Sequence, residues 1–333
     1  MTVTSKYIAL KEYIPEGNPS LSQFTVKEEN IELDKTKNIL VKNDWISVDP
    51  YMRARMTERK NYKEPFILNK PMEGSAIGKV IETNSSNFNV GDYVKSEYGW
   101  RDYFCAPSQD LEKINKIDLP IQTYLGPLGM TGHTAYIGLF KIGELKENQT
   151  ILVSSAAGSV GSMVCQIAKI KGCRVIASTG SDEKVEWLKK DLKVDEAFNY
   201  NKVENLVLHL KSLSPDGYDL YFDNVGGEFL ESAIFRMKNF GKIVICGRIS
   251  QMNNPNHQLK NIAHVLVKRL TIKGFLIFDH LEDTNNFYQD MQGWLVTNEI
   301  KWRETIVEGI ENAPKAFIDL LNGKNIGKML VKI

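Results

Sequence analysis

Long hydrophobic runs are absent from the 333-residue sequence, in which no window approaches the roughly 18 apolar residues that cross a bilayer. The opening segment, MTVTSKYIALKEYIPEG, has neither the unbroken apolar stretch nor the small-residue cleavage pattern of a signal peptide. Lys and Arg total 42 against 41 Asp and Glu, so no excess of positive charge points to nucleic acid or to an anionic membrane. We therefore expect a cytoplasmic protein that binds neither nucleic acid nor membranes.

Residues that ligate metals are also scarce. The sequence has four cysteines, at 105, 165, 173 and 246, and none forms a CxxC pair, which favours buried reduced thiols over disulfides or a structural zinc. None of the five histidines shares a ligand-like spacing with a cysteine. His209 and His264 lie in apolar helical runs and are interpreted as structural.

The pattern of apolar, polar and turn residues changes near residue 126. Before it, short apolar runs alternate with turn residues, as in GSAIGKVIET and NVGDYVKSEYGW, which is typical of antiparallel strands. After it, strand and helix patterns alternate, which predicts parallel βαβ units with right-handed crossovers. The predicted fold class is α/β, with a doubly wound parallel sheet and a separate, mostly β domain. A prior of about 150 residues per domain also favours two domains.

The expected elements of the second part follow from apolar periodicity. Strands are predicted at TILVSSA (150–156), RVIAST (174–179), EAFNY (196–200), YDLYFDNVGG (218–227), GKIVICG (241–247) and TIKGFLIF (271–278). Helical patterns run from about 160 to KGC, from 182, across 203–213 and from 228. The tail is expected to form a helix near 287–300, a strand at RETIV, a helix over 311–321 and a closing strand, KMLVKI. We expect the last strands to return to the first domain.

A glycine fingerprint lies between the first of these strands and the helix after it. In AAGSVG, Ala156, Gly158 and Gly161 occupy the three positions of G-x-G-x-x-G in the strand-to-helix context that the motif requires. The helix N-terminus would offer free N–H groups and partial positive charge to a pyrophosphate. The alternative is a tight βα turn that needs glycine for packing alone.

The end of the second strand distinguishes NADP from NAD. An NAD site places a carboxylate there for the ribose hydroxyls, whereas this chain has Ser178, Thr179, Gly180 and Ser181. Lys184 follows one helical turn later and could pair with a 2′-phosphate. NADP is therefore favoured over NAD. The alternative is that the charged residues 182–184 are only the usual charged residues of a helix start, with no role in cofactor binding.

Seven segments spread along the chain carry a family resemblance: SVDPYMRARM, LGPLGMTGHTAY, AAGSVGS, GSDEKVEWL, YDLYFDNVGGEF, ICGRISQ and NGKNIGKMLV. Together they resemble the zinc-independent medium-chain dehydrogenases/reductases of the leukotriene B4 12-hydroxydehydrogenase, or prostaglandin reductase, family, to which alkenal double-bond reductases and curcumin reductases are related. Glu73 and Gly74 stand where a zinc alcohol dehydrogenase would carry Gly-His-Glu, and no histidine is present there. No metal site is therefore expected.

The resemblance implies a GroES-like catalytic domain over 1–125, completed by 300–333, a Rossmann NADP-binding domain over 126–299, and NADPH in the cleft. Carried onto this sequence, the family positions that contact the cofactor are Gly158, Ser159, Val160 and Gly161 at the pyrophosphate, Lys184 and Tyr200 at the adenosine phosphate, and Asn224, Cys246, Gly247, Ile249, Ser250, Phe275, Leu276, Ile277 and Asn325 elsewhere.

The resemblance also implies reduction of the carbon–carbon double bond of α,β-unsaturated aldehydes or ketones. Hydride would reach the β-carbon, and a hydrogen-bond donor would stabilise the enolate oxygen. Relatives carry a tyrosine as donor where this chain has Met252, which cannot donate a hydrogen bond. Tyr51 is our substitute, with the nicotinamide ribose hydroxyl as a second donor. Tyr51 could instead be a packing aromatic, and Arg53 and Arg55 could be solvated strand charges.

Two other functions remain open at this point. One is a zinc-free NADPH quinone reductase, and the other is a non-catalytic NADPH-binding protein, which the loss of the family tyrosine at Met252 makes conceivable. A homodimer is expected because TIKGFLIFDH resembles an apolar strand at a sheet edge, and relatives pair that edge across a two-fold axis.

Overall fold

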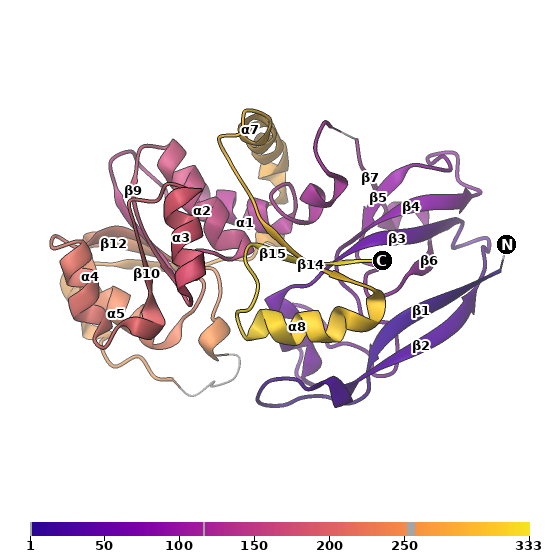
Figure 1. Ribbon diagram of the computed structural model, residues 1–333, viewed down its shortest axis with the longest axis horizontal. Helices are drawn as coiled ribbons and strands as arrows, with labels where there is room; N and C mark the ends of the chain where they lie inside the picture. The colour runs from indigo at the N-terminus through magenta and orange to yellow at the C-terminus, as the bar shows by residue number, and fades with distance from the viewer. Residues whose placement is uncertain (1, 116, 252–256) are drawn as a thin grey trace. The chain divides into compact units, whose positions relative to one another are not determined.

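The computed structural model describes residues 2–115, 117–251 and 257–333, so Met252 lies outside the described residues. The chain divides into two compact units (Figure 1). The β unit contains the residues up to Leu125 together with Glu304–Ile333, and the α/β unit contains Gly126–Arg303. Helices in the described part of the chain all fall short of the length and apolar character needed to cross a bilayer.

The β unit is built around a seven-stranded sheet with the order β14-β15-β3-β4-β5-β7, in which β6 also pairs with β3. The strands are β3 (Ile39–Ser47), β4 (Ala76–Thr83), β5 (Tyr93–Ser96), β6 (Tyr103–Ala106), β7 (Glu112–Lys113), β14 (Glu304–Glu308) and β15 (Lys328–Lys332). A separate ribbon joins β1 (Val3–Leu10) to β2 (Phe24–Ile31). Because β15 pairs with β3, the C-terminal residues complete a sheet that begins nearly 300 residues earlier.

The core of the β unit gathers segments that are far apart in the sequence. Trp100 is fully buried and lies edge-on to Phe317 of helix α8 (Ala313–Leu321), with ring centroids 6.2 Å apart. Met52 and Met56 pack in the same cluster from a short 3₁₀ helix, Pro50–Met56. This packing fixes the turn that carries Tyr51.

The α/β unit contains a six-stranded sheet with the order β10-β9-β8-β11-β12-β13, and every neighbouring pair is parallel. Its strands are β8 (Thr150–Val153), β9 (Arg174–Thr179), β10 (Glu196–Asn199), β11 (Tyr218–Asp223), β12 (Met237–Ile245) and β13 (Thr271–Gly274). The order reverses direction at β8, so this is a doubly wound sheet with its switch point between β8 and β11. The predicted fold class is confirmed.

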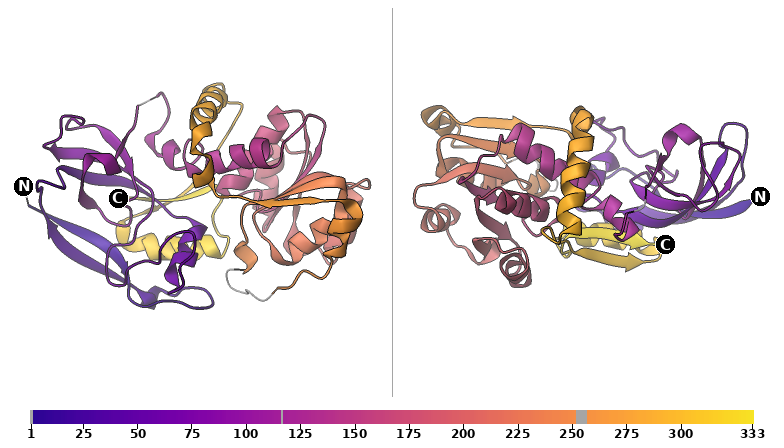
Figure 2. Two further views of the ribbon diagram at one scale, coloured as in Figure 1. Left: turned by 180° about the vertical axis from the view of Figure 1, so that it is seen from behind. Right: turned by 90° about the horizontal axis from the view of Figure 1, so that it is seen from above.

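Helices connect these strands and cover the sheet, as the two views of Figure 2 show. They are α2 (Ser159–Ile170), α3 (Asp182–Lys190), α4 (Leu206–Leu213), α5 (Gly227–Arg236) and α6 (Ala263–Lys268). Two further helices, α1 (Met130–Ile137) and α7 (Thr284–Val296), come before β8 and after β13 in the chain. Right-handed crossovers place the helices that follow β8 and β9 on the face opposite to α5 and α6. The helix α1 was not among the expected elements, whereas α6 contains His264, which was expected in an apolar helical run.

Three strands end three or four residues before their predicted ends. β8 stops at Val153, β11 at Asp223 and β13 at Gly274. The residues that follow leave the ladder for other partners: the Ala156 amide, for example, donates to the Ser178 carbonyl. After β13 the chain turns into a 3₁₀ segment, Ile277–Asp283, rather than extending the strand through Phe278. The predicted strands therefore include residues that belong to the loops after β8, β11 and β13.

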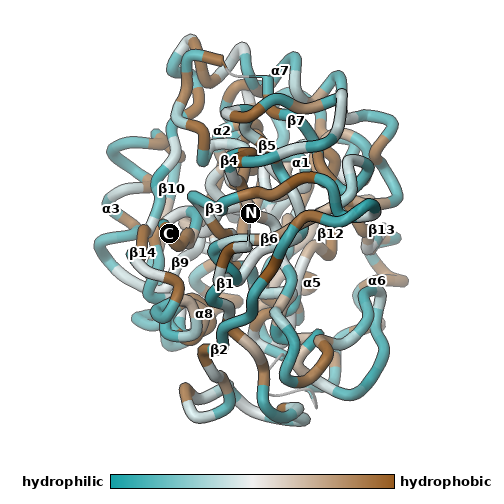
Figure 3. Tube along the Cα trace, turned by 90° about the vertical axis from the view of Figure 1, so that its right-hand side faces the viewer, coloured by the Kyte–Doolittle hydropathy of each residue, from teal (hydrophilic) through white to brown (hydrophobic). Residues whose placement is uncertain are grey.

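The strand β13 occupies one edge of the sheet, as expected. All four of its residues are exposed. The preceding helix α6, hydrophobic in the colouring of Figure 3, adds exposed apolar side chains at Leu266 and Val267. Ile272 is the one large apolar side chain on the strand, so this part of the surface combines Ile272 with the apolar side chains of the adjoining helix.

Candidate functional site

The carboxyl edge of the α/β sheet gathers most of the sequence-predicted cofactor residues. Because all six strands are parallel, the segments that follow them emerge at the same edge of the sheet. The glycine turn follows β8, Lys184 follows β9, and Tyr200 follows β10. The predicted segments 224, 246–250 and 275–277 follow β11, β12 and β13 in turn. These segments therefore all lie at the carboxyl ends of strands, where a doubly wound sheet binds its ligands.

The turn after β8 is too tight for larger residues. Ser155 adopts a positive φ of 49°, and a Cβ atom at Gly161 would lie 2.7 Å from the Ala156 Cα and nearer still to the Ser155 carbonyl oxygen. Gly158 is less crowded, since its Cβ would lie 3.2 Å from that oxygen. Gly161 is thus required for the close approach of α2 to the strand, while Gly158 leaves the outer side of the turn small.

The first turn of α2 differs from those of the next two helices. Ser181 accepts a hydrogen bond from the Lys184 amide at the start of α3, and Asn205 accepts one from the Leu208 amide at the start of α4. Among the described residues, no side chain caps α2, whose N-cap is Gly158. The first N–H groups of a helix have no partner within it. The amides at Ser159, Val160 and Gly161 can therefore serve an anion.

A buried carboxyl joins the loops after β8 and β11. Asp223 Oδ1 accepts hydrogen bonds from the Tyr221 hydroxyl at 2.6 Å, from the Val225 and Gly226 amides at 2.9 Å each, and from Ser154 Oγ at 3.3 Å. Its Oδ2 is buried and finds no partner among the described residues. Burial raises the pKa of Asp223, although these hydrogen bonds oppose the shift.

Sequence reasoning missed this carboxyl network. The only local signal is an aspartate that ends an apolar strand, and its partner Ser154 lies 69 residues away.

The predicted residues 224 and 246–250 are tied to the same two loops. The Asn224 amide and side chain both bond Ser154, the side-chain Nδ2 reaching the Ser154 carbonyl at 2.8 Å. The Cys246 and Gly247 amides donate to the Asp223 carbonyl, and the Ile249 amide donates to the Asn224 carbonyl. Ser250 Oγ donates to the Val225 carbonyl at 2.6 Å. Burial raises the pKa of the Cys246 thiol to about 12, so this group is no nucleophile at neutral pH.

The structure brings Tyr200 against the end of β9. A Cβ at Gly180 would lie 3.0 Å from the Tyr200 hydroxyl, so a larger residue there would require this ring to shift slightly. The Asn201 side chain donates to the Gly180 carbonyl at 2.9 Å. Lys184 stands in the first turn of α3, where burial lowers the pKa of its ammonium and Glu183 partly opposes that shift.

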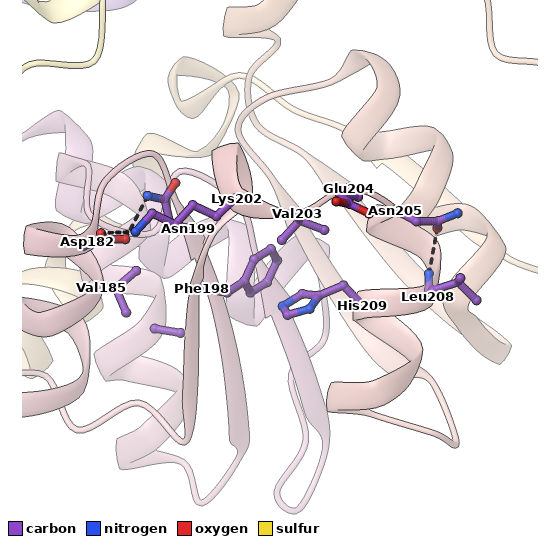
Figure 4. A pocket seen from close by; sticks show the side chains of 11 residues that line it. Asp182, Val185, Phe198, Asn199, Lys202, Val203, Glu204, Asn205, Leu208 and His209 are labelled. Carbon is purple, nitrogen blue, oxygen red and sulfur yellow. Dashed lines mark hydrogen bonds and ion pairs between the residues drawn. The ribbon is translucent and has the colours of Figure 1, made fainter.

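A pocket of about 550 Å³ lies beside this region, between α3, β10 and α4 (Figure 4). Its apolar walls include Val185, Phe198, Val203 and Leu208, and His209 stacks edge-on against Phe198 with ring centroids 4.6 Å apart. Asp182, Asn199 and Lys202 form a polar rim. The pocket includes none of the predicted cofactor residues.

The remaining predicted positions are placed as follows. Phe275 and Leu276 follow β13, and Ile277 is buried. Asn325 belongs to the β unit, is buried, and donates from Nδ2 to the Gly327 carbonyl at 2.8 Å.

Tyr51 lies in the 3₁₀ helix Pro50–Met56 of the β unit. Its ring packs on the core, and Lys63 Nζ stands 5.1 Å from the ring centroid. Burial raises the pKa of the Tyr51 phenol well above its usual value. The preceding segment is held by Lys328, which pairs with buried Asp49 at 3.0 Å and donates to the Val48 carbonyl. The phenol therefore keeps its proton at neutral pH, as a hydrogen-bond donor must.

The alternative of solvated strand charges at Arg53 and Arg55 is wrong. Both arginines are buried in the 3₁₀ helix rather than exposed on a strand. Arg53 donates twice to the Gly17 carbonyl, and Arg55 pairs with Glu73 at 2.6 Å with its guanidinium 4.2 Å from the Phe66 ring centroid. Their charges hold neighbouring loops together.

Comparison with known proteins gives a consistent result. The family model described as N-terminal domain of oxidoreductase matches residues 6–114, and that of zinc-binding dehydrogenase matches 159–296. The chain is 38% identical over 337 residues to the 2-alkenal reductase (NADP(+)-dependent) of Nicotiana tabacum, covering 99% of this chain and 98% of that protein. Prostaglandin reductase 1 of Bos taurus is 40% identical over 336 residues, with 99% of both chains covered. The chain belongs to the prostaglandin reductase and 2-alkenal reductase family.

The fold of this reductase family also matches in three dimensions. CurA from Vibrio vulnificus, solved in complex with NADPH, has a TM-score of 0.91 and 38% identity over 98% of both chains. Quinone oxidoreductases at 19–20% identity share the fold alone. Although one matching family model is named for zinc, no group of three or more His, Cys, Asp or Glu side chains in the described residues could hold a metal ion. The zinc-independent chemistry expected of this reductase stays a prediction.

Proposed function

We propose that this protein is an NADPH-dependent reductase that adds hydride to the β-carbon of α,β-unsaturated aldehydes and ketones. The observation that carries the proposal is the carboxyl edge of the sheet, where an uncapped helix α2 follows a glycine turn and Lys184 and Tyr200 follow the next two strands. It occurs in a chain similar along its whole length to an NADP(+)-dependent 2-alkenal reductase.

The residues at this edge suit a phosphorylated dinucleotide. Amides of Ser159, Val160 and Gly161 would hold the pyrophosphate, and Lys184 with Tyr200 would hold the 2′-phosphate. Residues of the loops after β11, β12 and β13, together with Asn325, would hold the remainder: Asn224, Cys246, Gly247, Ile249, Ser250, Phe275, Leu276 and Ile277. When bound, NADPH supplies the hydride. In this proposal the α/β unit is the NADP-binding domain and the β unit is the catalytic domain.

The protein's own chemical task is to stabilise the enolate oxygen. A protonated phenol can donate a hydrogen bond to developing negative charge, and tyrosine is protonated at neutral pH even without the upward pKa shift that burial causes at Tyr51. We propose Tyr51 as this donor, with the nicotinamide ribose hydroxyl as a second. Position 252, where relatives carry tyrosine, is the place to test whether a further donor improves the rate.

The proposal is tested by following NADPH absorbance with three reaction mixtures: an alkenal, a benzoquinone and no acceptor. Steady oxidation with the alkenal, faster than with the quinone, is the expected result. Faster quinone reduction would identify a quinone reductase, and NADPH binding without turnover would identify a non-catalytic binding protein. Met252→Tyr should raise the alkenal rate, because one oxyanion donor is worth a factor of about 100 to 1000.

The proposal includes a homodimer in the cytoplasm. The exposed edge of β13, with Ile272 on the strand and Leu266 and Val267 on α6, is an apolar surface that a second copy would cover. The free thiols of Cys105, Cys165 and Cys173 fit a reducing compartment. Cell fractionation tests the location, and sedimentation tests the dimer.

A further inference from the structure

An ion pair links the start of α3 to the turn that carries Tyr200. Asp182 Oδ2 lies 2.5 Å from Lys202 Nζ, and Asp182 Oδ1 accepts a hydrogen bond from Asn199 Nδ2 at 3.0 Å (Figure 4). These two hydrogen bonds, that of Lys202 first, lower the pKa of the Asp182 carboxyl, so it is ionised at neutral pH. The first turn of α3 therefore carries a fixed negative charge with a cation directly on it.

The pair adjoins the residues assigned to the 2′-phosphate. Asp182 is two residues from Lys184 on the same helical turn, and Lys202 is two residues from Tyr200 on the same 3₁₀ turn. The two segments also meet at Gly180, where an added Cβ would lie 3.0 Å from the Tyr200 hydroxyl and where the carbonyl accepts a hydrogen bond from Asn201. Because residues two apart on a helix do not face each other, a net charge on this pair would act on a phosphate held by Lys184 and Tyr200 through space rather than by contact.

Two carboxylates at this helix start create an electrostatic conflict. Asp182 and Glu183 suit the positive end of the helix dipole, but both would repel the roughly two negative charges of a 2′-phosphate. An unphosphorylated ribose would not feel this repulsion to the same degree. Neutralising one carboxylate thus favours NADPH selectively.

We propose that Lys202 is a specificity-determining residue, which favours NADPH over NADH by cancelling the charge of Asp182 beside the 2′-phosphate. This inference rests on the proposed function, since it takes NADPH as the cofactor. Lys202 differs from Lys184 in its role: Lys184 would contact the phosphate, whereas the Lys202 ammonium is engaged by Asp182. The identity of residue 202 then sets the net charge of the site without a contact to the ligand.

The test measures dissociation constants of NADPH and NADH by nicotinamide fluorescence for the full chain and four variants: Lys202→Gln, Asp182→Asn, the two combined, and Lys189→Gln. Lys189 is the matched control because it also pairs α3 with β10, at 3.0 Å from Glu196, but in the last turn of the helix. Thermal unfolding confirms that each variant is folded.

Lys202→Gln should weaken NADPH binding about fivefold at low salt and leave NADH within about twofold, because an exposed carboxylate acts through a high dielectric and is screened. The combined variant, which is again neutral at this pair, should bind NADPH within about twofold of the unmodified protein. Lys189→Gln should change neither constant.

Three results would overturn the inference. The first is that Lys202→Gln weakens NADPH and NADH binding equally, and the second is that it weakens neither. The third is that the combined variant binds NADPH as weakly as Lys202→Gln, which would make Lys202 a direct phosphate ligand. A protein that shows no preference for NADPH in its unmodified form would instead contradict the proposed cofactor. The two failures are therefore distinguishable.

Discussion

One carboxyl oxygen of Asp223 accepts hydrogen bonds from four donors, whereas the other is buried without a partner among the described residues. The four donors come from β11, from the loop after it and from Ser154 after β8. A buried acceptor of this kind is costly to remove, because every donor loses its partner at once. The side chain therefore fixes two loops of the proposed cofactor site relative to each other.

Replacing Asp223 should reveal this role through stability and its pH dependence. Burial raises the pKa of Asp223 in the folded chain above its unfolded value, so the unfolded chain releases this proton first as pH rises. The stability that Asp223 contributes at low pH is lost as pH rises through the folded-state pKa. Asp223→Asn has no proton to lose at this position and should not show this loss. From about pH 4 upward, the free energy of unfolding of the variant should therefore rise relative to that of the unmodified protein.

Urea unfolding at several pH values, from 4 to 8, checks this expectation. Asp223→Ala is the contrasting variant and should cost about 3 kcal/mol near pH 4, since it leaves the four donors unpaired, and less at higher pH, where the unmodified carboxyl has lost part of its own contribution. Parallel pH curves for the unmodified protein and Asp223→Asn would show that the carboxyl does not titrate as inferred.

Lys184 offers a second prediction for a single residue. Lys184→Ala should weaken NADPH binding about tenfold and NADH binding far less, because only NADPH carries the phosphate that its ammonium would pair with. Titration of each nucleotide into the protein gives both constants, and Lys189→Ala on the same helix serves as the control. An equal loss for the two nucleotides would remove Lys184 from the phosphate site.

The residues that the sequence could not assign have distant partners. Arg53 was open to interpretation as a solvated charge because its acceptor, the Gly17 carbonyl, is 36 residues away. Asp223 was overlooked for the same reason. By contrast, the roles predicted for Gly158 and Gly161 follow from their position between β8 and α2, and that predicted for Lys184 follows from its position after β9, at the start of α3; these cofactor roles stay predictions.

Among the elements, the strand ends are where sequence and structure differ most. Periodicity gave β9 (Arg174–Thr179) and the start of α3 at Asp182 as the structure has them. The strands β8, β11 and β13 were extended too far, because small or apolar residues such as Ala156 and Phe275 continue the pattern into the loops. Apolar character at these positions reflects packing around the site rather than ladder pairing.

The turn between β8 and α2 can be tested through two helical glycines. Gly161→Ala should destabilise the chain by about 2 kcal/mol or more, since the new Cβ would meet backbone atoms of Ser155 and Ala156 that cannot move independently. Gly293→Ala in α7 is the matched control, because nothing lies within 4 Å of its Cβ position. That change should be neutral or stabilise by up to about 1 kcal/mol.

Denaturant unfolding measures both variants, and nucleotide titration shows whether Gly161→Ala also weakens NADPH binding. Similar effects of the two substitutions would mean that the turn can relax, and that the glycine is not needed for close packing of α2 on the strand.

At the scale of the whole molecule, alternation of strand and helix patterns was enough to predict a doubly wound sheet. The order of that sheet follows from right-handed crossovers and a switch point. The pairing of β15 with β3 is of a different kind, because it joins segments nearly 300 residues apart and no local pattern specifies it.

The proposed homodimer is the prediction that concerns the molecule as a whole. An unpaired edge at β13 presents N–H and C=O groups to any other strand, and Ile272 and Leu266 add apolar surface beside it. Pairing two copies through this edge would remove the unpaired backbone groups and the neighbouring apolar side chains from water. A charge placed on the strand should therefore prevent association, because it would be buried without a partner in the dimer.

Sedimentation should give twice the chain mass for the unmodified protein and the chain mass for Ile272→Glu. The control is Leu208→Glu, since Leu208 is an exposed apolar residue on α4, at the other end of the sheet from β13. That variant should remain dimeric. If Ile272→Glu also sediments as a dimer while Leu208→Glu dissociates, the contact lies on the β10 side of the sheet, and the exposed edge at β13 must be tolerated by the single chain.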